Sequence, residues 1–86
     1  MDVRDREQWF AGQVAIVVGA TGGIGAAICE ELAKRGAGLR MIGRDSERLA
    51  SIAADVQDAA ASVETAVVDL RDRPGLTEAI DGWADA

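Results

Sequence analysis

The sequence contains no histidine, tyrosine or asparagine, and only one cysteine, Cys29, among its 86 residues. A single cysteine cannot form a disulfide within the chain, and without histidine no metal site of the His/Cys kind is expected. Cys29 falls inside a predicted helix, where we interpret it as a small packing residue rather than a reactive thiol. The usual catalytic constellations cannot be assembled from what remains, so we assign no catalytic residue and no metal ligand.

Positive charge is also scarce. Nine lysines and arginines stand against fifteen aspartates and glutamates, which gives a net charge of −6. No basic cluster outweighs this acidic background, so nucleic acid is not an expected partner. Residues 1–10 are charged and lack an apolar centre, which predicts a loose N-terminal arm rather than a signal peptide, with Trp9 and Phe10 packing at the edge of the core. No apolar run is long enough to cross a membrane, and we expect a cytoplasmic protein.

What the chain does contain is a regular alternation of strand and helix patterns. The unbroken apolar run Val14–Val18 predicts a buried parallel strand, and further strands are predicted over 39–43 and 63–69. Apolar residues at helical spacing predict a helix after each strand. The first covers about 23–35 and is followed by Gly36, a glycine suited to the C-cap. The second opens at Asp45, a suitable N-cap, and continues through the alanine run at 59–61. The third has Pro74 in its first turn.

This alternation predicts a fold class. Strands separated by helices form parallel sheets joined by right-handed crossovers. We therefore expect one α/β domain over residues 1–86, with a three-stranded parallel sheet in the order 3-2-1. The first two helices should lie on one face and the third on the opposite face. The arrangement is a Rossmann-type, three-layer half-domain, equivalent to one mononucleotide-binding half of a doubly wound fold.

The turn between the first strand and the first helix is rich in glycine. Its spacing fits GxxxGxG through Gly19, Gly23 and Gly25, and equally GxxGxxG through Gly19, Gly22 and Gly25. It does not fit GxGxxG, and the Lys-Ser/Thr pair of a P-loop is absent. Glycines let a ligand approach the backbone, and a helix start presents unpaired N–H groups to an anion. The pattern predicts a site for a nucleotide pyrophosphate; the alternative is a tight turn without a ligand.

Two further positions fall at the same edge of the predicted sheet. After the second strand, where a dinucleotide fold normally has an acid for the ribose, Gly43 is followed by Arg44, whose planar fork suits a phosphate. We therefore favour NADP(H) over NAD(H), the alternative being that Arg44 is a solvated surface residue. Arg48 could add to this site or face water. After the third strand, Asp69 can accept a hydrogen bond from adenine while Leu70 lies against the ring, or Asp69 can cap the following turn.

The segments VAIVVGATGGIGAAICEELAKRGA, MIGRDSERL and VVDLRD resemble the N-terminal cofactor-binding region of the short-chain dehydrogenase/reductase family. The resemblance extends from about Phe10 to Trp83, with the motifs in the family's order and spacing. It implies that the glycine turn binds the pyrophosphate, that Arg44 is tied to NADP preference, and that the end of the third strand contacts adenine. The implied cofactor-binding residues are Gly19, Thr21, Gly22, Gly23, Ile24, Gly25, Arg44, Asp69 and Leu70.

The family's chemistry, however, uses a Tyr and a Lys in a YxxxK pattern with Ser and Asn. This chain has no Tyr or Asn, and Lys34, its one lysine, belongs to the first helix. The resemblance therefore implies the NADP(H)-binding half of a carbonyl or alcohol oxidoreductase that is inactive on its own. The alternative is a non-catalytic structural module. Its exposed first-strand edge, Val14–Val18, predicts a homodimer, a larger assembly or a missing complementary half as partner.

Overall fold

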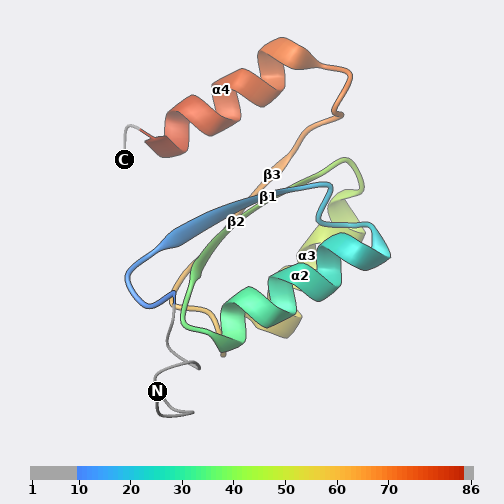
Figure 1. Ribbon diagram of the computed structural model, residues 1–86. Helices are drawn as coiled ribbons and strands as arrows, with labels where there is room; N and C mark the ends of the chain where they lie inside the picture. Colours follow the sequence, from blue (N-terminus) through green and yellow to red (C-terminus); the bar gives the residue numbers. More distant parts are fainter. Residues whose placement is uncertain (1–9, 85–86) are drawn as a thin grey trace.

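The computed structural model describes residues 10–84 (Figure 1). Strands and helices alternate along the chain, which confirms the predicted order. The elements are β1 (Val14–Val18), α2 (Gly23–Lys34), β2 (Gly38–Gly43), α3 (Ser46–Val56), β3 (Val63–Val67) and α4 (Arg73–Ala84). No helix between residues 10 and 84 is long and apolar enough to cross a membrane.

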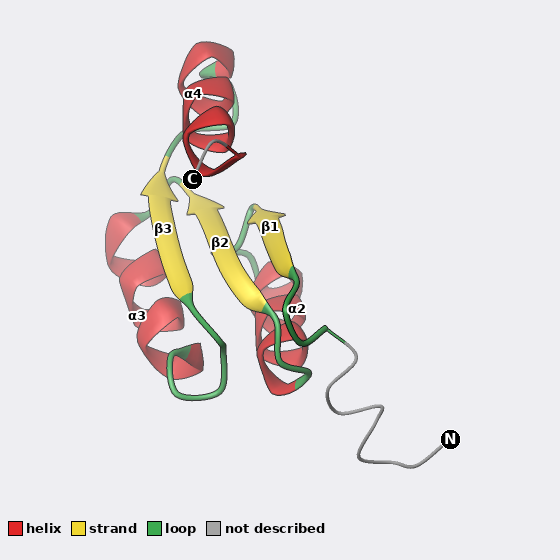
Figure 2. Cartoon of the chain, turned by 90° about the vertical axis from the view of Figure 1, so that its left-hand side faces the viewer, coloured by secondary structure: helices red, strands yellow, loops and turns green. Residues whose placement is uncertain are grey.

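The three strands form one parallel sheet in the order β1-β2-β3, as predicted (Figure 2). In the register of the sheet, Ile16 of β1 lies opposite Arg40 of β2, and Arg40 lies opposite Glu64 of β3. The carboxyl ends of all three strands therefore reach the same edge of the sheet, where the loops that follow β1, β2 and β3 come together.

The core lies between one face of the sheet and the helices α2 and α3. Helix α2 packs against β1 and β2, and α3 packs against β2 and β3. The side chains of Leu39 and Met41 are fully buried there, and each contributes roughly 1.5–3 kcal/mol through the apolar surface it removes from water. Cys29 is buried in the same cluster, and this burial raises the pKa of its thiol. The interpretation of Cys29 as a packing residue is confirmed.

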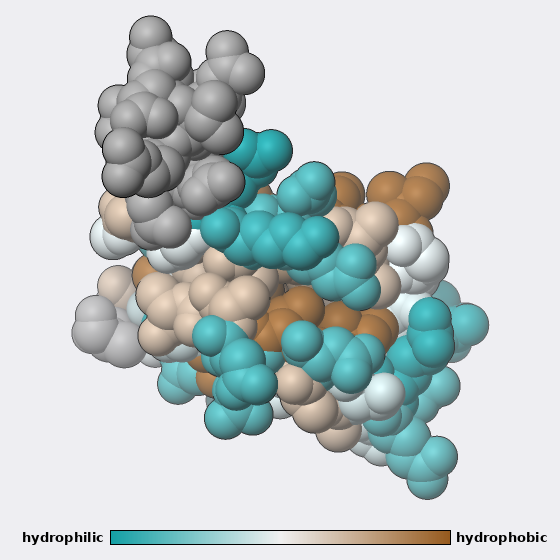
Figure 3. Space-filling model, turned by 90° about the horizontal axis from the view of Figure 1, so that it is seen from below, coloured by the Kyte–Doolittle hydropathy of each residue, from teal (hydrophilic) through white to brown (hydrophobic). Residues whose placement is uncertain are grey.

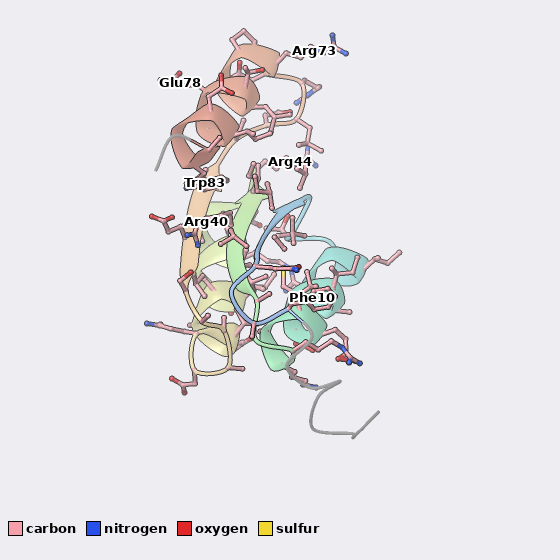
Figure 4. All side chains as sticks on the ribbon, turned by 60° about the vertical axis from the view of Figure 1, so that its left-hand side comes forward. Phe10, Arg40, Arg44, Arg73, Glu78 and Trp83 are labelled. Carbon is pink, nitrogen blue, oxygen red and sulfur yellow. The ribbon has the colours of Figure 1, made fainter. Side chains whose placement is uncertain are left out.

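Helix α4 lies on the other side of the sheet from α2 and α3, as predicted (Figure 1). None of its residues is buried. It covers the opposite face incompletely, because Val14, Ile16 and Val18 of β1 remain 41–56% exposed. A groove of about 340 Å³ separates β1 and Arg40 from Trp83 at the end of α4 (Figure 4). This face of the sheet is therefore only partly covered by the described chain. The prediction that Val14–Val18 is a buried strand is wrong in this respect, since only Val17 of β1 is buried.

The outer surface on the side of α2 and α3 mixes hydrophilic and hydrophobic side chains (Figure 3). Helix α2 contributes two exposed isoleucines to the molecular surface, Ile24 at 80% and Ile28 at 46%. Ile24 belongs to the first turn of α2, beside the glycine-rich segment.

Local hydrogen bonds fix the ends of the helices. At the end of α2, Gly36 has a φ of 90°, its N–H donates to Ala33, and the N–H of Ala37 donates to Leu32, which together form a Schellman motif. At the start of α3, the carboxylate of Asp45 accepts from the N–H of Arg48 at 3.1 Å, so the predicted N-cap is confirmed.

The N-terminal segment enters the fold beside α2. The N–H of Phe10 donates to the carbonyl of Arg35 at 3.0 Å, and Phe10 is half-buried, in keeping with the predicted edge of the core. Trp9 and most of the predicted N-terminal arm lie outside the described residues.

Two predicted boundaries are wrong. Helix α3 ends at Val56 and does not continue through the alanines at 59–61. Instead, the N–H of Ala61 donates to the carbonyl of Ala37 at 3.1 Å, and this bond begins the pairing that leads into β3. Strand β3 ends at Val67, two residues before Asp69, because its partner β2 ends at Gly43.

Candidate functional site

The glycine-rich turn after β1 is held against the end of β2. Gly19 has a φ of 81°, a left-handed conformation that favours glycine. The N–H groups of Gly19 and Ala20 both donate to the carbonyl of Ile42, each at 2.9 Å, and the N–H of Gly22 donates back to the carbonyl of Gly19 at 3.1 Å. These bonds close the turn and place the start of α2 directly beyond the end of β1.

Helix α2 begins at this turn without a side-chain cap. Gly22 is its N-cap residue and has no side chain to accept from the first turn. The N–H groups of Gly23, Ile24 and Gly25 consequently have no partner within the helix. Open space lies beside the α-carbon of Gly23. Such a helix end, with unpaired donors and the positive end of the helix dipole, can receive an anion.

Gly43 and Thr21 are in close contact across this edge of the sheet. A β-carbon on Gly43 would come within 2.6 Å of Cγ2 of Thr21. The Thr21 side chain therefore occupies the space into which a side chain at position 43 would extend. Arg44, just beyond the end of β2, then supplies the first exposed side chain after the strand (Figure 4).

Asp69, after β3, is held by Arg71. The carboxylate of Asp69 accepts from the backbone N–H of Arg71 at 2.9 Å, from its Nε at 3.1 Å and from its terminal nitrogen at 2.8 Å. In this chain Asp69 thus organises the following turn, as one of its two sequence interpretations predicts. These hydrogen bonds, with a smaller contribution from the charge of Arg44, hold the pKa of Asp69 well below its usual range. Asp69 is therefore an ionised acceptor at neutral pH.

These segments enclose one cleft of about 380 Å³ at the carboxyl ends of the strands. The residues that line it come from the glycine turn, the end of β2 and the segment after β3: Gly19, Thr21, Gly22, Gly43, Arg44, Val68, Asp69, Leu70 and Arg71. Six of the predicted cofactor-binding residues therefore meet in one place. The other three, Gly23, Ile24 and Gly25, form the adjoining first turn of α2.

Sequence reasoning missed Arg71 and left Arg48 undecided. Arg71 follows Asp69 by two residues, and that spacing in a turn was the available signal for a local ion pair. Arg48 donates from Nε to the carbonyl of Thr21 at 3.0 Å, across 27 positions of sequence. No local pattern indicates such a bond, because it depends on how α3 is placed beside the glycine turn.

Comparison with known proteins agrees with this geometry. The family described as short chain dehydrogenase matches residues 13–85. An uncharacterized oxidoreductase of Staphylococcus saprophyticus is 44% identical over 70 residues, covering 80% of this chain and 30% of that protein.

The similar solved structures include complexes with a nicotinamide dinucleotide. A metagenomic short-chain oxidoreductase in complex with NADP superposes with a TM-score of 0.81 and 33% identity, over 88% of this chain and 34% of its own. Carveol dehydrogenase from Mycobacterium avium in complex with NAD superposes with a TM-score of 0.80 and 32% identity, over 87% and 31%. The chain thus spans about a third of the length of these relatives.

Proposed function

The chain belongs to the short-chain dehydrogenase family, and from this premise we propose that it is the NADP(H)-binding portion of an oxidoreductase of that family. The observation that carries the proposal is the cleft at the carboxyl ends of the strands. It brings together the N-cap end of α2, an exposed arginine and an ionised acceptor around a space of about 380 Å³. In an open α/β sheet, this edge is where nucleotides bind.

In this proposal the N–H groups of Gly23, Ile24 and Gly25 bind the pyrophosphate, with Thr21 offering its hydroxyl from the same turn. Adenine lies against Leu70, which is 50% exposed at the rim of the cleft. Its amino group donates to Asp69. The carboxylate of Asp69 can accept this hydrogen bond in addition to those from Arg71, because its two oxygens together offer about four acceptor sites.

Arg44 supports the preference for NADP(H). It follows Gly43, a position without the acidic side chain that would bind the ribose hydroxyls of NAD, and the side chain of Thr21 fills the space beside Gly43. Arg44 lines the cleft, and its guanidinium can bind a 2′-phosphate through two donors at once. One solved relative holds NADP and another holds NAD, so the relatives do not decide the cofactor. The proposed preference for NADP(H) therefore rests on Gly43 and Arg44.

The chain's own contribution is binding rather than chemistry. The family's proton transfer would need a tyrosine, which this sequence lacks, and its one lysine, Lys34, lies at the far end of α2 from the cleft. We propose that this chain alone does not catalyse carbonyl reduction or alcohol oxidation. The cleft also lacks a wall beyond β1, so the described part of the chain contacts only the adenosine and pyrophosphate portions of the cofactor.

Titration calorimetry tests this proposal. We expect NADPH to bind with a dissociation constant no tighter than the high micromolar range, as befits a site that holds part of its ligand. Nanomolar affinity would contradict a half-site, and an absence of heat at millimolar NADPH would contradict a cofactor role.

A second candidate function is that of a structural, self-associating module. The observation that favours it is β1, an edge strand of the described sheet whose Val14, Ile16 and Val18 are 41–56% exposed. An exposed edge strand is a template for pairing with another chain. A second copy pairing along Val14–Val18, or a complementary half of the fold, would cover it. Light scattering at tens of micromolar tests self-association, and a clean monomer would count against it.

A further inference from the structure

The peptide unit between Thr21 and Gly22 is held at both ends. Its N–H, on Gly22, donates to the carbonyl of Gly19 at 3.1 Å. Its C=O, on Thr21, accepts from Nε of Arg48 at 3.0 Å. A peptide unit is planar, so fixing both of its polar groups fixes the orientation of the whole unit.

This peptide unit leads directly into the donors of the cleft. Gly22 is the N-cap of α2, and the N–H of Ala26 donates to its carbonyl at 2.9 Å as the first bond of the helix. The N–H groups of Gly23, Ile24 and Gly25 follow Gly22 without a break. Because glycines restrain the backbone weakly, an external hydrogen bond has more influence on this turn than it would on other residue types.

The backbone of Arg48 is itself held in place. It lies in the first turn of α3, and its N–H donates to the carboxylate of Asp45, the N-cap of that helix. Leu49, the next residue, is buried in the core. Helix α3 therefore presents the Arg48 side chain to the glycine turn from an anchored backbone.

We propose that Arg48 is a positioning residue for the pyrophosphate site. By holding the carbonyl of Thr21, it sets the direction of the N–H groups at the start of α2 before any ligand binds. The inference rests on the proposed cofactor function and names a residue on which the same site depends. Arg48 itself need not touch the cofactor.

An alternative role for Arg48 is as a second positive charge for the 2′-phosphate, beside Arg44. The two roles differ in which ligands they affect. A residue that orders the pyrophosphate turn supports NADH and NADPH alike, since both carry a pyrophosphate. A residue that binds the 2′-phosphate supports NADPH alone.

Two substitutions at position 48 separate the hydrogen bond from the charge. In Arg48→Gln, the side-chain nitrogen stands the same number of bonds from the backbone as Nε of arginine, so it can still donate to Thr21. In Arg48→Met, the side chain has similar length but no donor. Both variants lose the positive charge, so a difference between their affinities for a dinucleotide reports on the hydrogen bond to Thr21.

The experiment is a titration of the full chain and both variants with NADPH and, separately, with NADH, well below each protein's thermal midpoint. We expect Arg48→Met to bind both dinucleotides about fivefold more weakly than Arg48→Gln, as the loss of one hydrogen bond implies. The ratio of the two affinities should stay the same in both variants. A merely structural role would lower the thermal midpoint and leave the affinities unchanged.

Equal affinities in the two variants would overturn the inference, as would a loss confined to NADPH. In either case the unmodified chain would still bind the dinucleotides, and the proposed cofactor function would stand. If the unmodified chain binds neither dinucleotide, the proposed function itself fails and the role of Arg48 fails with it.

Discussion

The carbonyl oxygen of Gly19 occupies the space that a β-carbon on Gly25 would need. The same β-carbon would lie only 3.0 Å from the α-carbon of Ala20. Both contacts involve backbone atoms, which cannot be relieved by the rotation of a side chain. Gly25 is therefore required for the close approach of α2 to the end of β1, whether or not a ligand is bound.

It follows that Gly25→Ala destabilises the chain. Moving the backbone of the glycine turn to make room for the methyl group should cost about 1–3 kcal/mol, as overpacking in a tight interior does. Urea denaturation measures the change in the free energy of unfolding.

Gly23→Ala is the matched control, because no atom lies within 4 Å of a β-carbon at Gly23. This variant should keep its stability or gain up to about 1 kcal/mol from the better helix propensity of alanine. A ligand in the cleft should nevertheless bind more weakly, since the methyl group stands beside the unpaired N–H groups. Equal destabilisation by both substitutions would contradict this account of the turn.

Arg44→Ala should remove the preference for the 2′-phosphate. Loss of charge-assisted hydrogen bonds costs about 1.5–3 kcal/mol, so NADPH affinity should fall at least tenfold while NADH affinity changes little. Arg73→Ala, an exposed arginine outside the cleft at the start of α4, controls for the loss of one positive charge. Fluorescence titration with each dinucleotide measures the effect, and an equal loss for both ligands would argue against the assigned role.

The pairing of Asp69 with Arg71 predicts a loss of stability in acid. The pKa of Asp69 is lowered in the folded chain. A carboxyl group of this kind contributes stability above its unfolded pKa of about 3.9, and the contribution disappears as the pH falls through the lower folded value. Both partners are exposed to solvent, so the contribution is small.

The measurement compares the thermal midpoints of the chain and of Asp69→Asn at about pH 6 and about pH 2. The difference in thermal midpoint between the chain and Asp69→Asn should be smaller at the acidic pH. Asp58→Asn, at an exposed position after α3, controls for the change in charge. A difference that stays constant with pH would show that the ion pair adds nothing to folding.

Cys29 should be unreactive in the folded chain. Its side chain is fully buried beneath the sheet, and burial raises the pKa of the thiol, so both access and the thiolate form are limited. A disulfide reagent at neutral pH should label it only as fast as the protein opens, and at once in denaturant. Rapid labelling under native conditions would mean that the packing of α2 on the sheet is loose.

The sequence predicted the parts of the fold that local patterns determine. The strand over Val14–Val18, the N-cap Asp45 and the glycine after α2 each depend on a few neighbouring residues, and each was confirmed. The predicted burial of that strand was not, because it depends on what covers the sheet. Alanine favours helix, which is why the run at 59–61 read as part of α3. The bond from Ala61 to the carbonyl of Ala37 outweighs that preference, and it joins residues far apart in sequence.

In the candidate site, too, the features set by local patterns were predictable and those set by distant contacts were not. The glycine turn and Arg44 follow from motifs, and the fold brings them into one cleft with Asp69. The bond from Arg48 to the carbonyl of Thr21 was not predictable, because it depends on the placement of α3 against the turn. The hydrogen bonds from Arg71 engage the Asp69 carboxylate in the turn after β3 before any ligand binds.

The most direct test of a cofactor role is heat denaturation of the purified chain alone, with millimolar NADPH, and with millimolar NADH. A ligand that binds only the folded state raises the midpoint by mass action. We predict a rise with NADPH that exceeds any rise with NADH. Cooperative melting with no rise in either case would contradict the cofactor function and favour the structural module.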